Sequence, residues 1–338
     1  MLREAIERLT GFENLTSGQA FRAMQYIMNG KASDAQIASF LTALTMKGET
    51  TEEISGFARA MLSIACKVKT RAKLVVDTCG TGGDKKNTFN ISTTAAFVAA
   101  GAGVVIAKHG NRSVSSKSGS ADVLEKLGVN INLSAGHIAD CIDKIGIGFI
   151  YAPKAHAAMA NVAAARKEMG IKTVFNILGP ITNPAMAGGR VLGVYEEKLL
   201  GKITCALKSL GVKRALVAHG LEALDEISVS GKTLISDLNQ GRILRYTIAP
   251  DDFGLKCYCL AKIMGGDAGE NARILVNILK GRQKGAKRAA ALLNGAAAII
   301  AGGKANGFPE AIKMAAQSID SGKAMDRLNK LIDFTKKH

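Results

Sequence analysis

Tryptophan is absent from the chain and only five tyrosines are present, so few side chains can stack on nucleic-acid bases. The longest apolar run, residues 95–107, contains Gly101 and Gly103 and is too short for a membrane-spanning helix. The charged, amphipathic first eight residues do not resemble a secretory signal, which predicts a cytoplasmic location. The six cysteines lack CxxC spacing, which disfavours a zinc site or a disulfide framework. With 338 residues and 47% hydrophobic content, the chain can bury a large core and divide into two domains.

Charge of one sign is in excess. The chain has 45 Lys and Arg against 28 Asp and Glu, a net charge of +17. This balance favours polyanionic ligands, either phosphorylated small molecules or nucleic acid. The basic residues are spread along the sequence, which favours the small-molecule reading and disfavours nucleic acid as a partner.

Residues 73–93 form the stretch around which the chain is organised. Apolar residues are followed by a glycine cluster, Gly80, Gly82 and Gly83 with Asp84, and then by a helical pattern. Glycine backbone and a helix N-terminus both present free N–H groups, so this order predicts a phosphate site, although a plain tight turn would look similar. The spacing matches neither a Walker A loop nor a GxGxxG fingerprint.

The rest of the chain predicts an α/β fold. Residues 1–70 read as helices throughout, and from residue 71 to 338 strand and helix patterns alternate, with helices again at the end. Such alternation predicts a small all-helical N-terminal domain and a larger α/β domain with a mainly parallel central sheet flanked by helices. Helices from about 155–190 are candidates to join the first domain. Strands are expected at residues 104–107, 147–151, 190–195 and 214–219 and within 226–248, and one long helix at 155–169.

A second polar loop follows the strand expected at 104–107. Lys108 and Arg112 supply positive charge there, and Ser115, Ser116 and Ser120 supply hydroxyl groups. Loops at the carboxyl ends of parallel strands meet at one edge, so this loop should face the glycine loop across a crevice. Taken alone, it could equally be a solvated basic loop.

Asp225 and Glu226 are expected to open a strand at 226–230. Two adjacent carboxylates suit solvent or a bound cation, and Mg²⁺ is held by one or two carboxylates together with substrate phosphates. The pair is therefore a Mg²⁺ candidate only if it lies beside the phosphate site.

The combination of motifs resembles the anthranilate phosphoribosyltransferases of tryptophan biosynthesis. The resemblance runs nearly end to end and rests on DTCGTGGD, NTFNIST, KHGNRSVSSKSGSADVLEKLG, KTVFNILGPITNP and LDEIS. It implies transfer of the phosphoribosyl group of 5-phosphoribosyl 1-diphosphate to the amine of anthranilate, with Mg²⁺. It also implies a homodimer formed through the helical domain, with donor binding in the α/β domain.

The resemblance also implies site residues. The donor would be held by Gly80, Gly83, Asp84, Thr88, Asn90, Ile91, Ser92, Thr93, Lys108, His109, Gly110, Asn111, Arg112, Ser113, Val114, Ser115, Ser116 and Ser120. Mg²⁺ would be bound by Ser92, Asp225 and Glu226, and anthranilate by Gly80, Asn111 and Arg166. The guanidinium of Arg166 offers a planar fork for the acceptor carboxylate.

His109 and His156 are the candidates for accepting the proton of the attacking amine. An aromatic amine attacking an electron-poor carbon needs no strong base, and either ring could simply pack or hydrogen-bond.

The stretch 156–166 departs from the family, which usually has prolines where Ala157 and Ala164 stand and a lysine near Ala160. Loss of two prolines raises the entropy cost of ordering the loop, which bears on the acceptor pocket. Two alternatives stay open: a nucleoside phosphorylase of similar fold, and a non-catalytic nucleic-acid-binding relative, which the +17 charge would suit.

Overall fold

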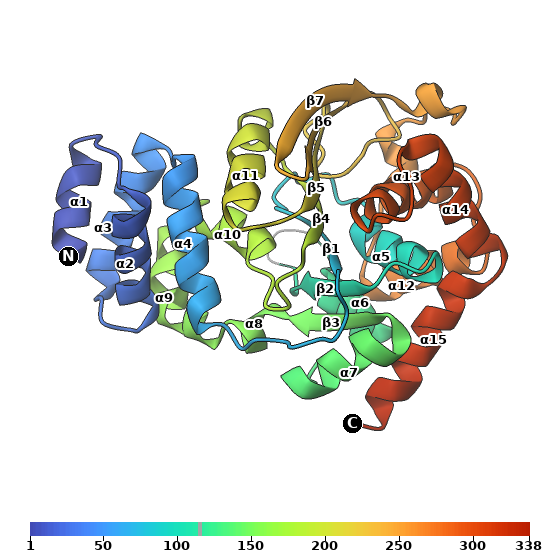
Figure 1. Ribbon diagram of the computed structural model, residues 1–338, viewed down its shortest axis with the longest axis horizontal. Coiled ribbons are helices and arrows are strands. Elements are labelled where there is room, and N and C mark those ends of the chain that lie inside the picture. The colour runs from blue at the N-terminus through green and yellow to red at the C-terminus, as the bar shows by residue number, and fades with distance from the viewer. Residues whose placement is uncertain (114–116) are drawn as a thin grey trace.

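The computed structural model describes residues 1–113 and 117–338 and begins with a bundle of helices at one end of the molecule (Figure 1). Local signals start three of them, because Thr16, Ser33 and Thr50 each accept a hydrogen bond from the N–H three residues on, in a capping box. The bundle helices are α1 (Leu2–Thr10), α2 (Ser17–Met28), α3 (Asp34–Lys47) and α4 (Thr51–Ile64).

The larger part of the molecule is built on one sheet. Within the described residues seven strands are ordered β3-β2-β1-β4-β5-β6-β7, with β1 to β5 parallel and β6 and β7 antiparallel. The fold predicted from the sequence is therefore confirmed. The strands are β1 (Val76–Gly80), β2 (Ile106–Gly110), β3 (Ile147–Tyr151), β4 (Gly189–Gly193), β5 (Arg214–Gly220), β6 (Thr233–Asn239) and β7 (Arg242–Ile248).

Helices cover both faces of the sheet and create two cores (Figure 1). One core contains α5 and the C-terminal helices, and the other joins the helical bundle, α9 to α11 and one face of β4 and β5. These helices are α5 (Ile91–Gly101), α6 (Ser120–Lys126), α7 (Ala135–Ile145), α8 (Ala152–Ala155), α9 (Ala160–Met169), α10 (Phe175–Ile181), α11 (Glu197–Ser209), α12 (Ala268–Leu279), α13 (Ala286–Ala301), α14 (Phe308–Asp320) and α15 (Lys323–Lys336), with single 3₁₀ turns at Ala157–Met159, Pro250–Phe253 and Leu260–Ile263. No helix among the described residues is long and apolar enough to cross a membrane.

The prediction of a strand that begins at Asp225 and Glu226 is wrong. Residues 225–230 run as a loop between β5 and β6, because their backbone bonds to side chains instead of to a neighbouring strand. The Ile227 N–H donates to Asn294 Oδ1 of α13 at 2.9 Å, and Asn294 Nδ2 donates to the Ile227 carbonyl at 3.0 Å. When side chains satisfy the backbone N–H and C=O groups in this way, a segment with alternating apolar and polar residues does not need to pair with another strand.

The prediction of one long helix at 155–169 is also wrong. This segment contains the end of α8, a 3₁₀ turn and α9, because His156 adopts φ −122° and ψ 57°, outside the helical region. The strand expected at 104–107 lies slightly later, as β2. This shift brings Lys108 and His109 into the strand itself.

Candidate active site

The glycine loop leaves β1 at Gly80 and enters α5 at Ile91. Gly82 and Gly83 adopt φ +66° and +78°, which residues with a Cβ rarely reach. The Gly82 N–H donates to Asp225 Oδ2 at 2.7 Å, and the Thr81 N–H donates to the Gly193 carbonyl at 2.9 Å. The loop is thus fixed to the acid pair on one side and to the end of β4 on the other.

Asp225 and Glu226 lie beside this loop and the start of α5. Glu226 Oε1 accepts the Ser92 N–H at 3.1 Å, so the expected Mg²⁺ ligands Ser92, Asp225 and Glu226 are brought together. Burial, followed by the charges of Asp84 and Glu226, raises the pKa of Asp225 well above its usual value. Burial also raises the pKa of Glu226, against the opposing effect of Lys108. Without a cation, both carboxyl groups therefore favour the neutral form, and a bound cation would favour the ionised one.

Lys108 supplies a buried positive charge to the same place. It is 3% exposed, and its Nζ donates to the Thr78 carbonyl at 2.6 Å. Burial lowers the pKa of Lys108, while the charges of Asp77 and Glu226 act in the opposite direction. Glycine loop, acid pair and lysine thus converge where the parallel strands end, the usual ligand edge of such sheets.

The second loop is joined to the first through Asn90, whose Nδ2 donates to the Ser118 carbonyl at 3.2 Å. Arg112 forms ion pairs with two residues of α6, Asp122 at 2.8 Å and Glu125 at 2.6 Å. Its role in donor binding stays a prediction.

The remaining donor candidates lie around these two loops. Thr88 forms an isolated bridge with Met264, Ile91 and Thr93 are buried in α5, Gly110 ends β2, the Ser113 N–H donates to Asp122, and the Ser120 hydroxyl donates to the Asn111 carbonyl. Val114, Ser115 and Ser116 lie outside the described residues.

His109 and His156 form a buried pair with ring centroids 5.2 Å apart. Burial lowers the pKa of both rings, and for His109 the neighbouring His156 and Arg190 lower it further. His156 Nε2 lies 2.9 Å from the Thr182 carbonyl. Both rings are therefore neutral near pH 7, and neither is a strong base.

Arg166 lies on α9 with its guanidinium carbon 5.1 Å from the centre of the Phe175 ring. Phe175 begins α10, and the Pro180 carbonyl near the end of that helix accepts from Cys79, next to Gly80. α10, which the sequence analysis did not foresee, thus connects the expected acceptor arginine to the glycine loop.

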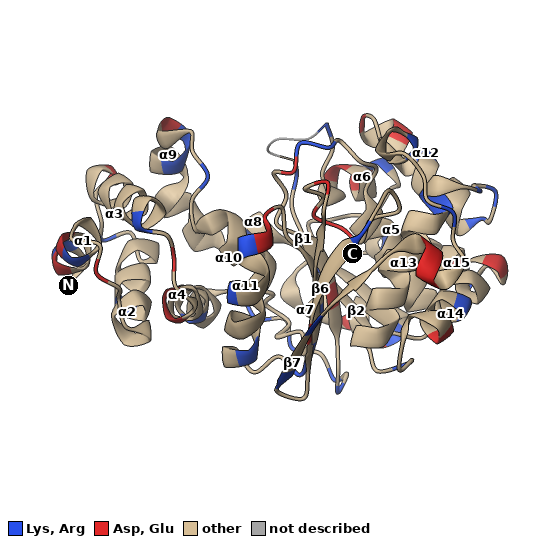
Figure 2. Ribbon diagram, turned by 90° about the horizontal axis from the view of Figure 1, so that it is seen from above, with Lys and Arg blue, Asp and Glu red and all other residues tan. Residues whose placement is uncertain are grey.

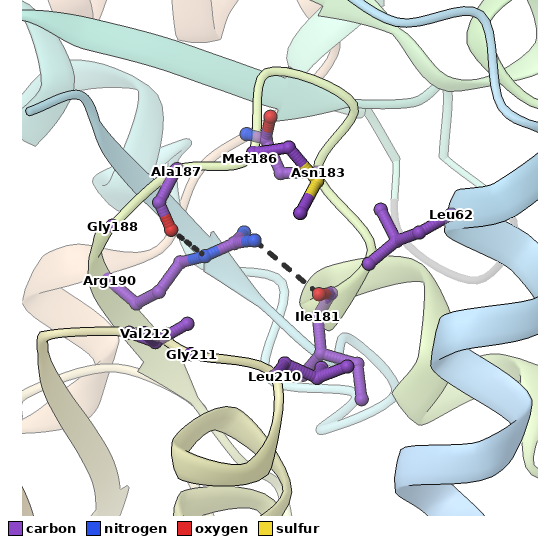
Figure 3. Close-up of a pocket in the computed structure, with 10 residues that line it drawn as sticks. All are labelled: Leu62, Ile181, Asn183, Met186, Ala187, Gly188, Arg190, Leu210, Gly211 and Val212. Carbon is purple, nitrogen blue, oxygen red and sulfur yellow. Dashed lines mark hydrogen bonds between the residues drawn. The ribbon is translucent and has the colours of Figure 1, made fainter. Parts of the chain in front are cut away.

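A buried ion pair that sequence reasoning missed lies beneath the site. Arg190 Nη1 contacts Asp77 Oδ2 at 2.9 Å, with side chains 3% and 0% exposed, and Asp77 Oδ1 accepts the His109 N–H at 3.0 Å. Figure 3 shows Arg190 at the edge of a cavity of about 110 Å³, where its guanidinium donates to the Ala187 and Ile181 carbonyls. The only sequence signal is a charged residue within each of two apolar strands.

A second missed residue is Lys172, in the segment between α9 and α10. Its Nζ donates to the Gly83 carbonyl at 3.0 Å. The motif KTVFNILGP contains this lysine, but nothing in the spacing connects it to a loop 89 residues earlier.

Comparison with known proteins follows the same division of the chain. Residues 72–325 match the glycosyl transferase family, a/b domain, and residues 3–65 match its helical bundle domain. An anthranilate phosphoribosyltransferase of Alkaliphilus metalliredigens is 50% identical over 335 residues, covering 99% of this chain and 98% of that protein. One of Clostridium kluyveri is 49% identical over 334 residues, covering 99% of both.

Solved structures agree with these relatives. Anthranilate phosphoribosyltransferase from Thermus thermophilus superposes with a TM-score of 0.94 at 38% identity, covering 98% of this chain and 99% of that one. The Saccharomyces cerevisiae enzyme in complex with PRPP and Mg gives 0.92 at 30% identity, covering 100% and 98%. The chain belongs to the anthranilate phosphoribosyltransferase family.

Proposed function

We propose that this protein transfers the phosphoribosyl group of 5-phosphoribosyl 1-diphosphate to the amine of anthranilate. The products are N-(5-phosphoribosyl)anthranilate and diphosphate. The observation that carries the proposal is the convergence of the glycine loop, Lys108 and the acid pair at one edge of the sheet. That arrangement suits a leaving group that carries phosphate charge.

In this reaction the amine nitrogen bonds to the anomeric carbon of the ribose as the bond from that carbon to the diphosphate oxygen breaks, and the nitrogen releases one proton to the solvent. Negative charge grows on the departing diphosphate. Backbone N–H groups of the glycine loop, the N-terminus of α5 and Lys108 would stabilise that charge. The protein otherwise acts by holding the amine in line with the bond that breaks.

Ser92, Asp225 and Glu226 would hold Mg²⁺. Their fit is tested by the acid cluster: burial, together with the charge of Asp84, raises the pKa of both Asp225 and Glu226, so a bound cation would favour their ionised forms. No group of three or more His, Cys, Asp and Glu side chains in the described part of the chain encloses a metal. The proposal therefore depends on two carboxylates and one hydroxyl, a set that suits Mg²⁺ because this ion is commonly bound by one or two carboxylates together with waters and substrate phosphates. When bound, Mg²⁺ would neutralise charge on the diphosphate.

Gly80→Ala is expected to reduce activity at least tenfold, because the new Cβ would lie 2.3 Å from Asp225 Oδ2 and push the carboxylate aside. Steady-state rates measured across a Mg²⁺ titration should show a higher half-saturating concentration. Gly82→Ala provides the contrast, since a Cβ there meets nothing within 4 Å and only its φ of +66° is unfavourable. A Mg²⁺ requirement raised equally in both variants would show that displacement of the Asp225 carboxylate is not the cause.

Arg166, Gly80 and Asn111 would contact anthranilate. Burial lowers the pKa of Arg166, and its contact with the Phe175 ring leaves the guanidinium in a partly apolar setting. A carboxylate ligand in that setting gains more from the positive charge than it would in water. The same segment contains Ala157, Ala160 and Ala164, so acceptor affinity is where this chain should differ from its relatives.

His109→Asn is expected to lower kcat less than tenfold, because a buried, neutral imidazole is a weak base and the amine needs little help. Because the folded pKa of His109 lies below the unfolded value, its neutral form favours folding at neutral pH. That stability is lost as the pH falls below about 6.5. Urea unfolding at pH 7.5 and pH 5.5 should show a smaller acid loss in His109→Asn than in the wild type. Abolished turnover with unchanged substrate binding would instead make His109 essential.

Assembly as a homodimer through the helical bundle is part of the proposal, as is a cytoplasmic location. Phe12 and Met46, 66% and 71% exposed, lie on the bundle and would be covered by a second copy. Sedimentation analysis of the wild type and of Phe12→Ser with Met46→Ser tests this surface.

The transfer itself is tested by mixing the protein with anthranilate, 5-phosphoribosyl 1-diphosphate and Mg²⁺ and following loss of anthranilate fluorescence. No loss, together with tight, salt-sensitive DNA binding, would favour the nucleic-acid-binding alternative. Figure 2 shows Lys and Arg spread over many elements, which argues against a dedicated nucleic-acid surface. The phosphorylase alternative would require turnover with phosphate and a nucleoside.

A further inference from the structure

Lys172 connects three separate segments at the joint between the helical bundle and the sheet. Its Nζ donates to the Gly83 carbonyl at 3.0 Å and lies 3.5 Å from the centre of the Tyr195 ring. Tyr195 belongs to the turn between β4 and α11, and its N–H donates to the Thr81 hydroxyl at 3.3 Å. Lysine and tyrosine thus hold the glycine loop at two residues, Gly83 and Thr81.

The contact with Gly83 determines which way the next amide points. In a trans peptide the C=O and the following N–H point in opposite directions, so fixing the Gly83 carbonyl also fixes the Asp84 N–H. The carbonyl is turned outward to Lys172. The amides of Gly83 and Asp84 have no hydrogen-bond partner among the residues the structure describes, so both remain available to an anion.

Gly83 is held closely as well as hydrogen-bonded. A Cβ at this position would lie 3.0 Å from both Cε and Nζ of Lys172. Gly83 has φ +78°, and the close contact with Lys172 limits the orientations open to the peptide between Gly83 and Asp84. Without the lysine, glycine would allow this peptide more orientations.

We propose that Lys172 is a positioning residue for the donor: it orients the 83–84 peptide so that the Asp84 N–H faces the diphosphate, with the Tyr195 ring holding the ammonium. This inference rests on the proposed function and names a determinant of donor binding within it. The segment that carries Lys172 also carries Phe175, which packs on Arg166. The connection between α9 and α10 therefore lies next to the residues expected to bind anthranilate as well as to the loop expected to bind the diphosphate.

Lys172→Met is expected to raise the KM for 5-phosphoribosyl 1-diphosphate about tenfold and to lower kcat by a smaller factor, since one charge-assisted hydrogen bond is lost. The KM for anthranilate should change less than threefold. Lys172→Arg, which keeps a donor and a charge that stacks on aromatic rings, should recover much of the loss. Lys208→Met, an exposed lysine of α11, is the matched control and should behave as the wild type.

Two substitutions of Tyr195 distinguish the contribution of its ring from that of its hydroxyl. Tyr195→Phe keeps the aromatic face and should leave the donor KM unchanged, whereas Tyr195→Leu removes it and should raise that KM by a few-fold. Equal behaviour of the two variants would show that the ring does not hold the ammonium, and would overturn that part of the proposal.

Hydrogen exchange of the ligand-free protein gives a readout independent of turnover. Peptides covering residues 80–88 should exchange faster in Lys172→Met than in the wild type, and inorganic pyrophosphate with Mg²⁺ should protect them less. If the wild type shows no transfer, the proposed function fails, but this comparison still decides the role of Lys172. An unchanged donor KM in an active Lys172→Met protein, or unchanged exchange of the loop, overturns the inference.

Discussion

Replacing the acid pair, Asp225→Asn with Glu226→Gln, is expected to lower the transfer rate about a thousandfold or more at Mg²⁺ concentrations that saturate the wild type. The neutral side chains keep the shape of the site and can still accept the Gly82 and Ser92 N–H groups. They lack the charge that would draw a cation to the diphosphate, and loss of one such electrostatic contact commonly reduces rates a hundredfold or more. Rates measured over a wide Mg²⁺ range should show a raised requirement.

The same variant should be at least as stable as the wild type when no Mg²⁺ is present. Burial makes ionisation of both carboxyl groups costly, and neutral replacements of the same shape remove that cost. Thermal unfolding without metal tests this. The exposed neighbours Asp251 and Asp252, changed to asparagine together, are the control for removing two acids. An unchanged metal dependence in the acid-pair variant would remove Asp225 and Glu226 from the site.

The second large effect is expected on stability. Arg190→Met should lower the free energy of unfolding by about 3–5 kcal/mol, because it leaves the Asp77 carboxylate buried without its partner. The change also removes hydrogen bonds to the Ala187 and Ile181 carbonyls. Denaturant titration with the wild type measured in parallel provides the comparison.

The double variant Asp77→Asn with Arg190→Met separates charge from packing. It should be more stable than Arg190→Met alone, since no uncompensated charge remains and the asparagine oxygen can still accept the His109 N–H. Arg3→Met, which breaks an exposed pair with Glu7, should leave stability nearly unchanged. A loss in Arg190→Met as small as that in Arg3→Met would show that the buried pair contributes little.

Local patterns predicted much of the fold. Residues 1–70 are helical as expected up to the end of α4, and the glycine loop leads from β1 into α5. The acid pair was identified as a metal candidate while its backbone was assigned to a strand. That error arose because Asn294, far along the chain, satisfies the Ile227 backbone, and alternation alone cannot reveal such a partner.

Long-range pairing explains what the sequence could not give. Asp77 and Arg190 are separated by 113 residues, and Lys172 and Gly83 by 89, so neither contact leaves a periodic signal. α10 was missed because it is short and contains Pro180, which normally argues against a helix.

The outermost strand, β7, is exposed along most of its length and presents Arg242 and Arg245 (Figure 2). An edge strand has N–H and C=O groups without a neighbouring strand, so another chain can pair with it and extend the sheet. Positive charge on this strand makes two such edges repel each other. We therefore expect these arginines to disfavour extension of the sheet by a second copy at high concentration.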